Sequence, residues 1–272
     1  MVSRHQRPSR RPAAGRRAGQ RAGGRARRGL RRGRRGLLRI ALTIELPPPP
    51  PPSLDPLVDI WPAGRELVRV HDGRFGAASF NPGKGRGRFH PFDDARGDVV
   101  PVLYAADCLD GALSETLFHS LPPRPDPGAA AEAFLDHDLD RAAAAQRGFR
   151  RQRLRGRMAS VLEPRRDLAL ARLSGHGLGR LGVARDELIT SPASAYAQTA
   201  AWAAALHRQH DGLDGLAWTS RQFDDARAVV LFGDRTDGAL RIADGPEPLD
   251  LGRGLDRVRR AAELARITIF EY

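Results

Sequence analysis

The chain of 272 residues contains a single cysteine, Cys108, and a single lysine, Lys84. One cysteine cannot form a disulfide within the chain, and such sparse use of cysteine is compatible with a reducing compartment. We therefore expect the protein in the cytoplasm. Every other basic residue is an arginine, which indicates a coding bias toward GC-rich codons.

Long apolar runs and familiar site motifs are absent as well. No stretch approaches the ~20 consecutive apolar residues of a membrane-spanning helix, so no membrane association is expected. The chain has no pair of cysteines and no HExxH sequence for a metal, and it lacks the Gly-x-Ser-x-Gly motif of serine hydrolases. Gly83-x-Gly85-x-Gly87 lacks the spacing of a dinucleotide fingerprint, and Gly85 after Lys84 excludes a P-loop. The sequence therefore predicts no metal and no resident cofactor.

The net charge of +13 belongs to an N-terminal tail. Residues 1–39 contain fifteen arginines and no acidic residue, which leaves 30 basic against 32 acidic residues in the rest of the chain. Residues 1–46 have too few apolar side chains to offset the entropy of ordering, so they are predicted to be disordered.

Three interpretations of this tail are open. A dense run of arginines could bind nucleic acid without sequence specificity. Arg34-Arg35 resembles the start of a twin-arginine export signal, but the apolar stretch that follows is short, contains Glu45 and runs into prolines. The tail could also be dispensable and lie upstream of the natural start, which is the interpretation we favour.

Six prolines, Pro47–Pro52, separate the tail from the rest of the chain. They predict a stiff, extended linker over residues 47–53. Residues 54–272 then form one domain, which is long enough for a well-buried core.

Short apolar runs and two helical patterns organise this domain. Residues 72–98, rich in glycine, aspartate and proline, are predicted to be loop, and residues 124–158 give no clear signal. The predicted helices are 108–120, which Asp107 would cap, and 191–210, which begins at Ser191-Pro192. The predicted strands are 67–70, 99–106, 167–173, the antiparallel pair 216–220 and 228–232, and a C-terminal edge strand at 266–272. Without regular βαβ alternation, this mixture predicts an α+β fold.

Three side chains within 28 positions have the chemistry of a substrate site: Arg88, Tyr104 and Glu115. Arg88 follows a glycine-rich turn, Tyr104 lies on a predicted strand, and Glu115 lies on the helix after that strand. Glu115 is off the apolar stripe of the helix and one turn before His119. Gly111 costs a helix about 1 kcal/mol against alanine, which indicates that something approaches the same face closely.

Two further residues could join this site. Arg69 interrupts an apolar strand, and an arginine there needs a partner or an opening to solvent. Ser220 ends a later apolar run, where its hydroxyl could cap the next turn or face a cleft. Taken singly, Glu115 and Tyr104 are better explained as an ordinary surface and an ordinary strand residue, and Ser220 is as well explained as a cap. Arg69 is harder to explain in this way.

The order of these residues resembles the RES domain family, named for Arg, Glu and Ser, whose members include toxins of toxin–antitoxin pairs that degrade NAD⁺. The similarity covers about residues 65–235. It departs at Phe89-His90, where the family often has Trp-Asn, and in residues 124–158, which are longer than usual. The matching stretches are LVRVH (67–71), GRFHP (87–91), PVLYA (101–105), ALSETLFH (112–119), AYAQTAAWAAALH (195–207), GLAWTS (215–220) and VVLFGDR (229–235).

The resemblance implies a single compact RES domain, with a fold similar to that of ADP-ribosyltransferase toxins. It also implies cleavage of NAD⁺, with phosphate accepting the ADP-ribose unit and nicotinamide leaving. Nicotinamide leaves as a neutral base, so the site needs no general acid. It must instead stabilise a ribosyl cation, a task suited to a carboxylate, and we expect Glu115 to perform it.

The resemblance gives the other candidates roles in binding. Arg69 and Arg88 would hold the pyrophosphate or the incoming phosphate by charge-assisted hydrogen bonds. Tyr104 would pack on the cationic nicotinamide ring, and Ser220 would bind the nicotinamide ribose or the phosphate. The expected catalytic residues are Glu115, Ser220 and Arg88. The further candidates are His71, His119 and Arg221.

The partners follow from the same resemblance. NAD⁺ is expected as substrate rather than cofactor, together with inorganic phosphate and a cognate antitoxin protein. NAD⁺ hydrolysis, or transfer of ADP-ribose to a macromolecule, is an alternative for the same site. A protein of another class, without enzymatic activity, would bind nucleic acid through the arginine-rich tail. The sequence leaves the acceptor and the oligomeric state open.

Overall fold

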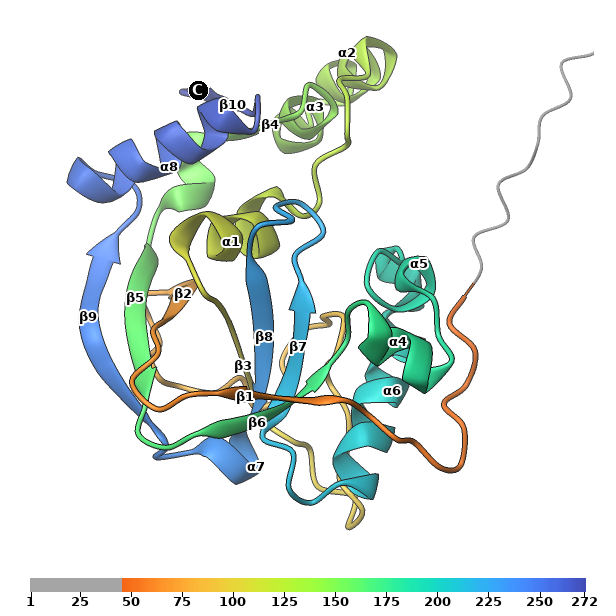
Figure 1. Cartoon of the computed structure of the whole chain (residues 1–272). Coiled ribbons are helices and arrows are strands. Elements are labelled where there is room, and N and C mark those ends of the chain that lie inside the picture. The colour runs from red at the N-terminus through yellow and green to blue at the C-terminus, as the bar shows by residue number, and fades with distance from the viewer. Residues whose placement is uncertain (1–45) are drawn as a thin grey trace, which may run out of the picture. The chain divides into compact units, whose positions relative to one another are not determined.

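A curled sheet of eight strands organises residues 46–272, the part of the chain that the computed structural model describes (Figure 1). Its strand order is β1-β6-β7-β8-β3-β2-β5-β9, and each neighbouring pair except β6 and β7 runs antiparallel. The strands are β1 (Val58–Trp61), β2 (Leu67–Asp72), β3 (Val102–Ala106), β5 (Arg157–Pro164), β6 (Leu168–Arg172), β7 (Gly215–Thr219), β8 (Arg227–Phe232) and β9 (Leu240–Pro248). A separate parallel pair is β4 (Gly148–Arg150) and β10 (Thr268–Phe270).

The helices lie around this sheet, and together the two kinds of element confirm the predicted α+β class. Helix α1 continues directly into a π-helical turn, η1 (Ser114–Phe118), and two 3₁₀ turns are η2 (Arg151–Leu154) and η3 (Ala193–Ala195). The α-helices are α1 (Leu109–Leu113), α2 (Pro127–Leu135), α3 (Leu139–Ala145), α4 (His176–Leu181), α5 (Arg185–Leu188), α6 (Tyr196–Gln209), α7 (Gly233–Thr236) and α8 (Gly252–Leu264). None of the helices described within residues 46–272 combines the length and the apolar character needed to cross a membrane.

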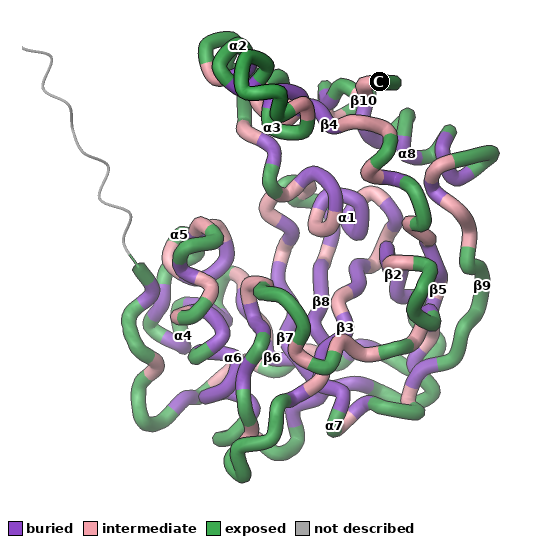
Figure 2. The backbone as a smooth tube through the Cα atoms, turned by 180° about the vertical axis from the view of Figure 1, so that it is seen from behind, coloured by how far each residue is buried: buried purple, intermediate pink, exposed green. Residues whose placement is uncertain are grey.

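The central strands are buried on both faces (Figure 2). Successive side chains of a strand point to opposite faces. On β8, Val229 and Leu231 join a core cluster to which all eight strands contribute, whereas Val230 and Phe232 pack in the cluster that holds Trp202 of α6. A strand buried on both faces needs apolar residues throughout, which explains the unbroken apolar run of β8.

The apolar runs predicted as strands are confirmed, with shifted ends. Strand β3 begins at Val102 rather than at residue 99, because Pro101 has no N–H to donate to a neighbouring strand. Strands β7 and β8 form the predicted antiparallel pair, with Leu216 opposite Val230. The C-terminal strand was expected at an edge of the main sheet, but it pairs with β4 outside that sheet.

Both predicted helices begin later than their expected starts. Cys108, not Asp107, caps α1, and its sulfur accepts the N–H of Gly111 at 3.4 Å. The Asp107 carboxylate instead accepts the N–H of Arg227 at 3.0 Å. Helix α6 begins at Tyr196, after the turn η3, and Ser191 does not cap it.

The proline-rich segment contacts the domain at its start. Pro47 is buried, and the carbonyl of Pro48 accepts a hydrogen bond from the indole N–H of Trp202 at 2.8 Å. Because extended proline segments have no internal hydrogen bonds, such carbonyls are free for outside donors. The packed structure therefore begins before the predicted boundary at Leu54. The disorder predicted for the tail falls on residues 1–45, which lie outside the described residues.

Candidate active site

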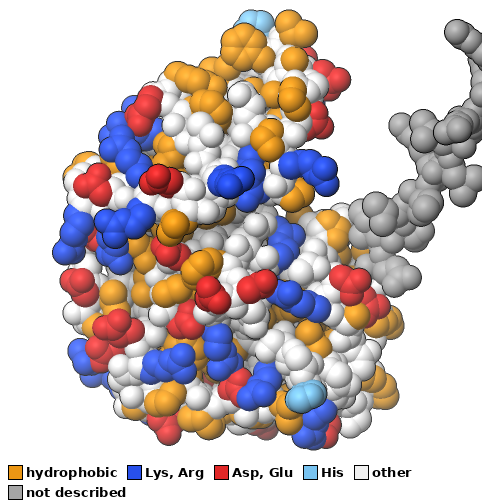
Figure 3. Space-filling model, turned by 45° about the horizontal axis from the view of Figure 1, so that its top comes forward, with side chains coloured by type: hydrophobic (Ala, Val, Ile, Leu, Met, Phe, Trp, Pro, Cys, Tyr) orange, Lys and Arg blue, Asp and Glu red, His pale blue; other side chains and the backbone are white. Residues whose placement is uncertain are grey.

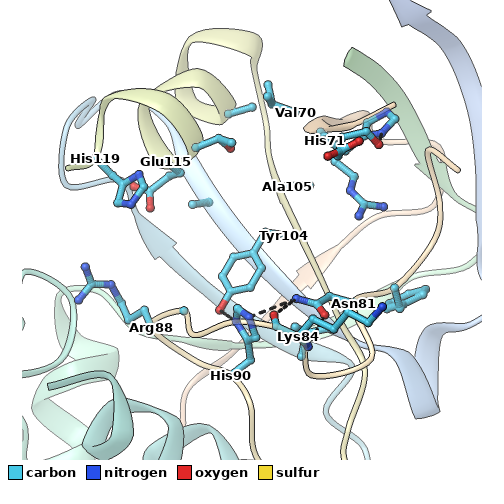
Figure 4. A pocket seen from close by; sticks show the side chains of 18 of the residues that line it. Val70, His71, Asn81, Lys84, Arg88, His90, Tyr104, Ala105, Glu115 and His119 are labelled. Atoms are coloured by element: carbon cyan, nitrogen blue, oxygen red, sulfur yellow. Dashed lines mark hydrogen bonds between the residues drawn. The ribbon is translucent and has the colours of Figure 1, made fainter. Parts of the chain in front are cut away.

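Seven of the eight candidate side chains meet at one cavity of about 650 Å³ (Figure 4). Tyr104 stands between two groups of residues in that view: Glu115 and His119 from the helix, and Arg88 and His90 from the loop before β3. The candidates that line the cavity are Arg69, His71, Arg88, Tyr104, Glu115, His119 and Arg221. The eighth candidate, Ser220, is fully buried behind it.

Glu115 lies in the π-helical turn η1, a widened turn of a kind that is frequent at functional sites. Its Oε1 accepts the hydroxyl of Ser220 at 2.7 Å and the backbone N–H of Arg221 at 3.3 Å. Among the described residues no donor reaches Oε2. One oxygen is therefore anchored to the loop after β7, and the other is available to a ligand.

Ser220 acts on the cavity through Glu115. Its hydroxyl donates to the carboxylate and accepts the N–H of Gln222 at 3.3 Å. Since Ser220 has no exposed surface, the contact with ribose or phosphate that the resemblance implies has no opening in this arrangement. Ser220 is a positioning residue here.

Arg88 is held in place by the segment before α6. One guanidinium nitrogen, NH1, donates to the carbonyl of Ser191 at 3.1 Å and to its hydroxyl at 3.0 Å, and the group lies 5.4 Å from the ring centre of Tyr196. Burial lowers the pKa of Arg88. The other guanidinium nitrogens have no partner among the described residues, so they can bind an anion from a fixed position.

Arg69, the strand arginine, is held in a similar way. Its NH1 donates to the carbonyls of Ala77 at 2.6 Å and of Ser79 at 2.7 Å. Burial lowers its pKa to about 10, so the group stays protonated near neutral pH. The predicted need for a partner is met by backbone oxygens of the loop, and the charge itself faces the cavity uncompensated.

A hydrogen-bonded chain orients Tyr104. Asn81 exchanges two bonds with the backbone of Lys84, which fixes its amide, and the Asn81 NH₂ group also donates to Nε2 of His90 at 3.3 Å. Burial lowers the pKa of His90, so its ring is neutral, and its Nδ1 lies within hydrogen-bond distance of the Tyr104 oxygen at 3.1 Å. That oxygen also accepts the N–H of Phe89 at 3.1 Å. The Tyr104 hydroxyl is protonated, since burial raises the pKa of Tyr104 far above its usual range.

This chain explains one of the glycines before Arg88. A Cβ on Gly87 would lie 2.3 Å from the ring of His90 and 3.3 Å from the Tyr104 oxygen. No other residue fits beside that pair without moving the ring. His90, Asn81 and Tyr196 were not among the predicted site residues, although His90 and Tyr196 fall within the stretches that resemble the family.

The two candidate histidines differ in what they can do. His71 has both ring nitrogens engaged, Nε2 with the Ser160 hydroxyl at 2.9 Å and Nδ1 with the carbonyl of Asp72 at 3.1 Å. His119 has a buried Nδ1 without a hydrogen-bond partner. Burial lowers the pKa of both rings, so both are neutral near pH 7. His119 therefore has a ring nitrogen that no described residue engages, and that nitrogen is itself buried.

Gly111 lies where other parts of the chain approach the helix closely, as the sequence pattern indicates. A Cβ at this position would lie 2.5 Å from the Cβ of Ala226 and 3.2 Å from that of Ala106. The close neighbours are thus residues of the same chain, from the loop before β8 and the end of β3.

The cavity carries an excess of positive charge. Asp72, one of its two acidic residues, forms an ion pair with Arg74 at 2.7 Å, which leaves Glu115 as the acidic group that faces the basic side chains. The basic residues that line the cavity are Arg69, Lys84, Arg86, Arg88 and Arg221. Such a field attracts an anionic ligand. Within residues 46–272, no three histidine, cysteine, aspartate or glutamate side chains gather as they would around a metal ion.

The curled sheet and this cavity define an α+β domain in which one unpaired carboxylate, Glu115, lies among basic side chains. A family model described as the RES domain matches residues 66–252, and the chain belongs to this family. The match confirms the resemblance and extends it through β9.

Comparison with known proteins adds one structural relative. The chain is similar to a chain in the crystal structure of the M. tuberculosis MbcT–MbcA toxin–antitoxin complex, with 18% sequence identity and a TM-score of 0.43. The similarity covers 68% of this chain and 84% of that chain. No curated protein matches the chain in sequence.

Proposed function

We propose that the protein cleaves the nicotinamide–ribose bond of NAD⁺, with inorganic phosphate as the acceptor. The observation that carries this proposal is the anchored Glu115 carboxylate, with one free oxygen, in a cavity that is otherwise positive. NAD⁺ has the matching chemistry, since its pyrophosphate is anionic and its reacting carbon becomes cationic.

The reaction balances without a proton donor. The bond between the ribose C1′ and the pyridinium nitrogen breaks, and its electron pair leaves with nicotinamide, which becomes neutral. The ribose then carries the positive charge, which the fixed carboxylate of Glu115 stabilises. A phosphate oxygen forms the new bond to C1′ and gives an ADP-ribose phosphate ester.

The other side chains of the cavity bind and orient. Arg69 and Arg88 each present guanidinium nitrogens, held by backbone carbonyls, to the pyrophosphate or to the acceptor phosphate. Tyr104 presents a neutral hydroxyl and a ring face to the nicotinamide end. His119 lines the cavity beside Glu115.

Water or a macromolecule could replace phosphate at the same carbon. We favour phosphate because the positive charges in the cavity exceed the two that the pyrophosphate of NAD⁺ requires. The biological role we propose is that of a toxin restrained by a cognate antitoxin, as the family resemblance implies. The similar chain belongs to a toxin–antitoxin complex.

A rival function of another class is nucleic-acid binding through the arginine-rich tail. On the face shown in Figure 3, acidic and basic side chains of the domain are interspersed rather than gathered into a basic stripe. The arginines that this rival invokes are those of residues 1–39. Full-length protein and a variant with the tail arginines replaced by glutamine should turn over NAD⁺ equally if the domain is the enzyme.

The acceptor is tested by following NAD⁺ with phosphorus NMR, using the full chain freed of any bound antitoxin. Loss of NAD⁺ that requires inorganic phosphate, with a new sugar-phosphate signal, is the expected result. Loss without phosphate that releases ADP-ribose would make the enzyme a hydrolase. No loss in either condition, from protein shown to be folded, would overturn NAD⁺ cleavage and leave transfer to a macromolecule or nucleic-acid binding.

A further inference from the structure

The only lysine of the chain lines the candidate active site. The sequence uses arginine at every other basic position, 44 in all. Lys84 is exposed and also lines the cavity, so it lies where the cavity meets solvent. A lysine differs from arginine in one chemical respect that matters here, because its amine can be acylated and thereby lose its charge.

The backbone of Lys84 is fixed although its side chain is exposed. The Asn81 side chain accepts the N–H of Lys84 at 2.7 Å and donates to the Lys84 carbonyl at 2.8 Å. The same amide group contacts His90, which bonds to Tyr104. The point from which the Lys84 side chain extends is therefore tied to the network that orients Tyr104.

The charge of Lys84 is uncompensated within the described residues. No carboxylate of residues 46–272 lies within 4.0 Å of its amine. Of the two acidic residues of the cavity, Asp72 forms an ion pair with Arg74, and Glu115 is anchored to Ser220 through one oxygen. An exposed, unpaired ammonium at an anion-binding cavity is free to contact an anionic group of the ligand.

We infer that Lys84 contacts an anionic group of the ligand and is the position at which N-acylation switches the cavity off. The inference rests on the proposed function for its readout. The amine first loses a proton to solvent, and its nitrogen then attacks the carbonyl carbon of an activated acyl donor such as acetyl phosphate. The N–C bond forms, the C–O bond breaks, and phosphate leaves with the electron pair. The product is a neutral amide that no longer attracts an anion.

Because the chain has a single lysine, a loss of activity on acylation can be assigned to one side chain. Full-length protein and K84R are treated with acetyl phosphate, and the modified positions are found by peptide mass spectrometry. Lys84 and the N-terminal amine are the amines of the chain, and K84R keeps the charge but removes the reactive side chain. K84Q and R86Q serve as matched variants, because Arg86 lines the same cavity and cannot be acylated in this way.

Complete acetylation of Lys84 should lower kcat/KM for NAD⁺ by at least about tenfold. At partial acetylation, the loss should follow the fraction of Lys84 that is acetylated. K84R keeps, after treatment, the turnover that it has before treatment. K84Q reproduces the acetylated protein, and ADP-ribose slows acetylation of Lys84. Complete acetylation of Lys84 with unchanged turnover, or equal inactivation of K84R, would overturn the inference.

A binding measurement separates this inference from the proposed function. If the untreated protein does not turn over NAD⁺, the affinity for ADP-ribose is measured by calorimetry before and after acetylation. Weaker binding only in the acetylated wild type supports the role of Lys84 although NAD⁺ cleavage has failed. Unchanged affinity, or no binding before treatment, overturns the role of Lys84 as well.

Discussion

At the scale of single residues, three charged groups of the site are each held in place by hydrogen bonds within the chain. Glu115 is held by the Ser220 hydroxyl, Arg88 by Ser191, and Arg69 by backbone carbonyls of the following loop. Each group keeps further oxygens or nitrogens for a ligand. A group held before the reaction does not have to reorganise during it, which is the main source of electrostatic catalysis.

Replacing Ser220 by alanine tests this arrangement. The substitution removes one donor from the carboxylate but leaves the N–H of Arg221 in place. A hydrogen bond to a charged group contributes about 1.5–3 kcal/mol, so kcat should fall by about ten- to a hundredfold. KM for NAD⁺ should change little, because Ser220 does not line the cavity. A rise in KM with unchanged kcat would instead place Ser220 in contact with the substrate.

At the scale of elements, the helix that carries Glu115 has two parts with different tasks. The α-helical part packs against the sheet, with Gly111 against Ala226. The π-helical turn then presents Glu115 and Thr116 to the cavity, and His119 follows at its end. The packing of the first part thus sets the position of the second.

Replacing Gly111 by alanine should lower the free energy of unfolding. Alanine improves helix propensity by about 1 kcal/mol, but its Cβ would lie 2.5 Å from that of Ala226, and overpacking of this kind costs about 1–3 kcal/mol. Gly179 of α4 is the matched control, since a Cβ there meets nothing within 4 Å. Urea denaturation should show G111A destabilised and G179A unchanged or stabilised. Equal effects at the two positions would contradict the packing role.

Sequence patterns predict the buried elements better than the exposed ones. β7 and β8 are short apolar runs because both of their faces are covered. β9, an edge strand, is exposed over most of its length and contains Gly245 and two prolines, so its sequence resembles a loop. α8 has Leu255, Val258 and Ala262 at helical spacing. This apolar stripe is hard to recognise in the sequence because the segment also contains many arginines.

Sequence patterns likewise predict some features of the candidate site and not others. Residue types and order predict which side chains gather, because they lie near strand ends and on one helix. They do not predict that Ser220 would bond to Glu115 across 105 positions, or that Asn81 and His90 would orient Tyr104. Such contacts depend on loop conformations that have no periodic signal.

At the scale of the whole molecule, three histidines that line the cavity should make the free energy of unfolding depend on pH. Burial lowers the pKa of His71, His90 and His119 below the ordinary value of 6.5. The folded protein keeps these rings neutral, whereas the unfolded chain binds protons as the pH falls through 6.5. The unfolded state then holds more protons, so the stabilising contribution is full above that pH and is lost below it.

The free energy of unfolding should therefore decrease between pH 7.5 and pH 5.0. Urea denaturation at a series of pH values measures it, and the range stays above the titration of the carboxylates. Replacing His119 by glutamine should reduce the slope, because that ring has no partner to lose. A free energy that is constant or rises toward pH 5.0 would contradict neutral, buried histidines.

The most direct test of the central claim compares NAD⁺ turnover and NAD⁺ binding by the full-length protein and by Glu115→Gln. The amide keeps the size of the side chain and can still accept the bond from Ser220, but it removes the charge that would face the ribosyl cation. Turnover should fall by at least about a hundredfold while NAD⁺ still binds and the thermal unfolding temperature is retained. Turnover equal to that of the wild type would remove Glu115 from the chemistry and, with it, the account of this cavity as an NAD⁺-cleaving site.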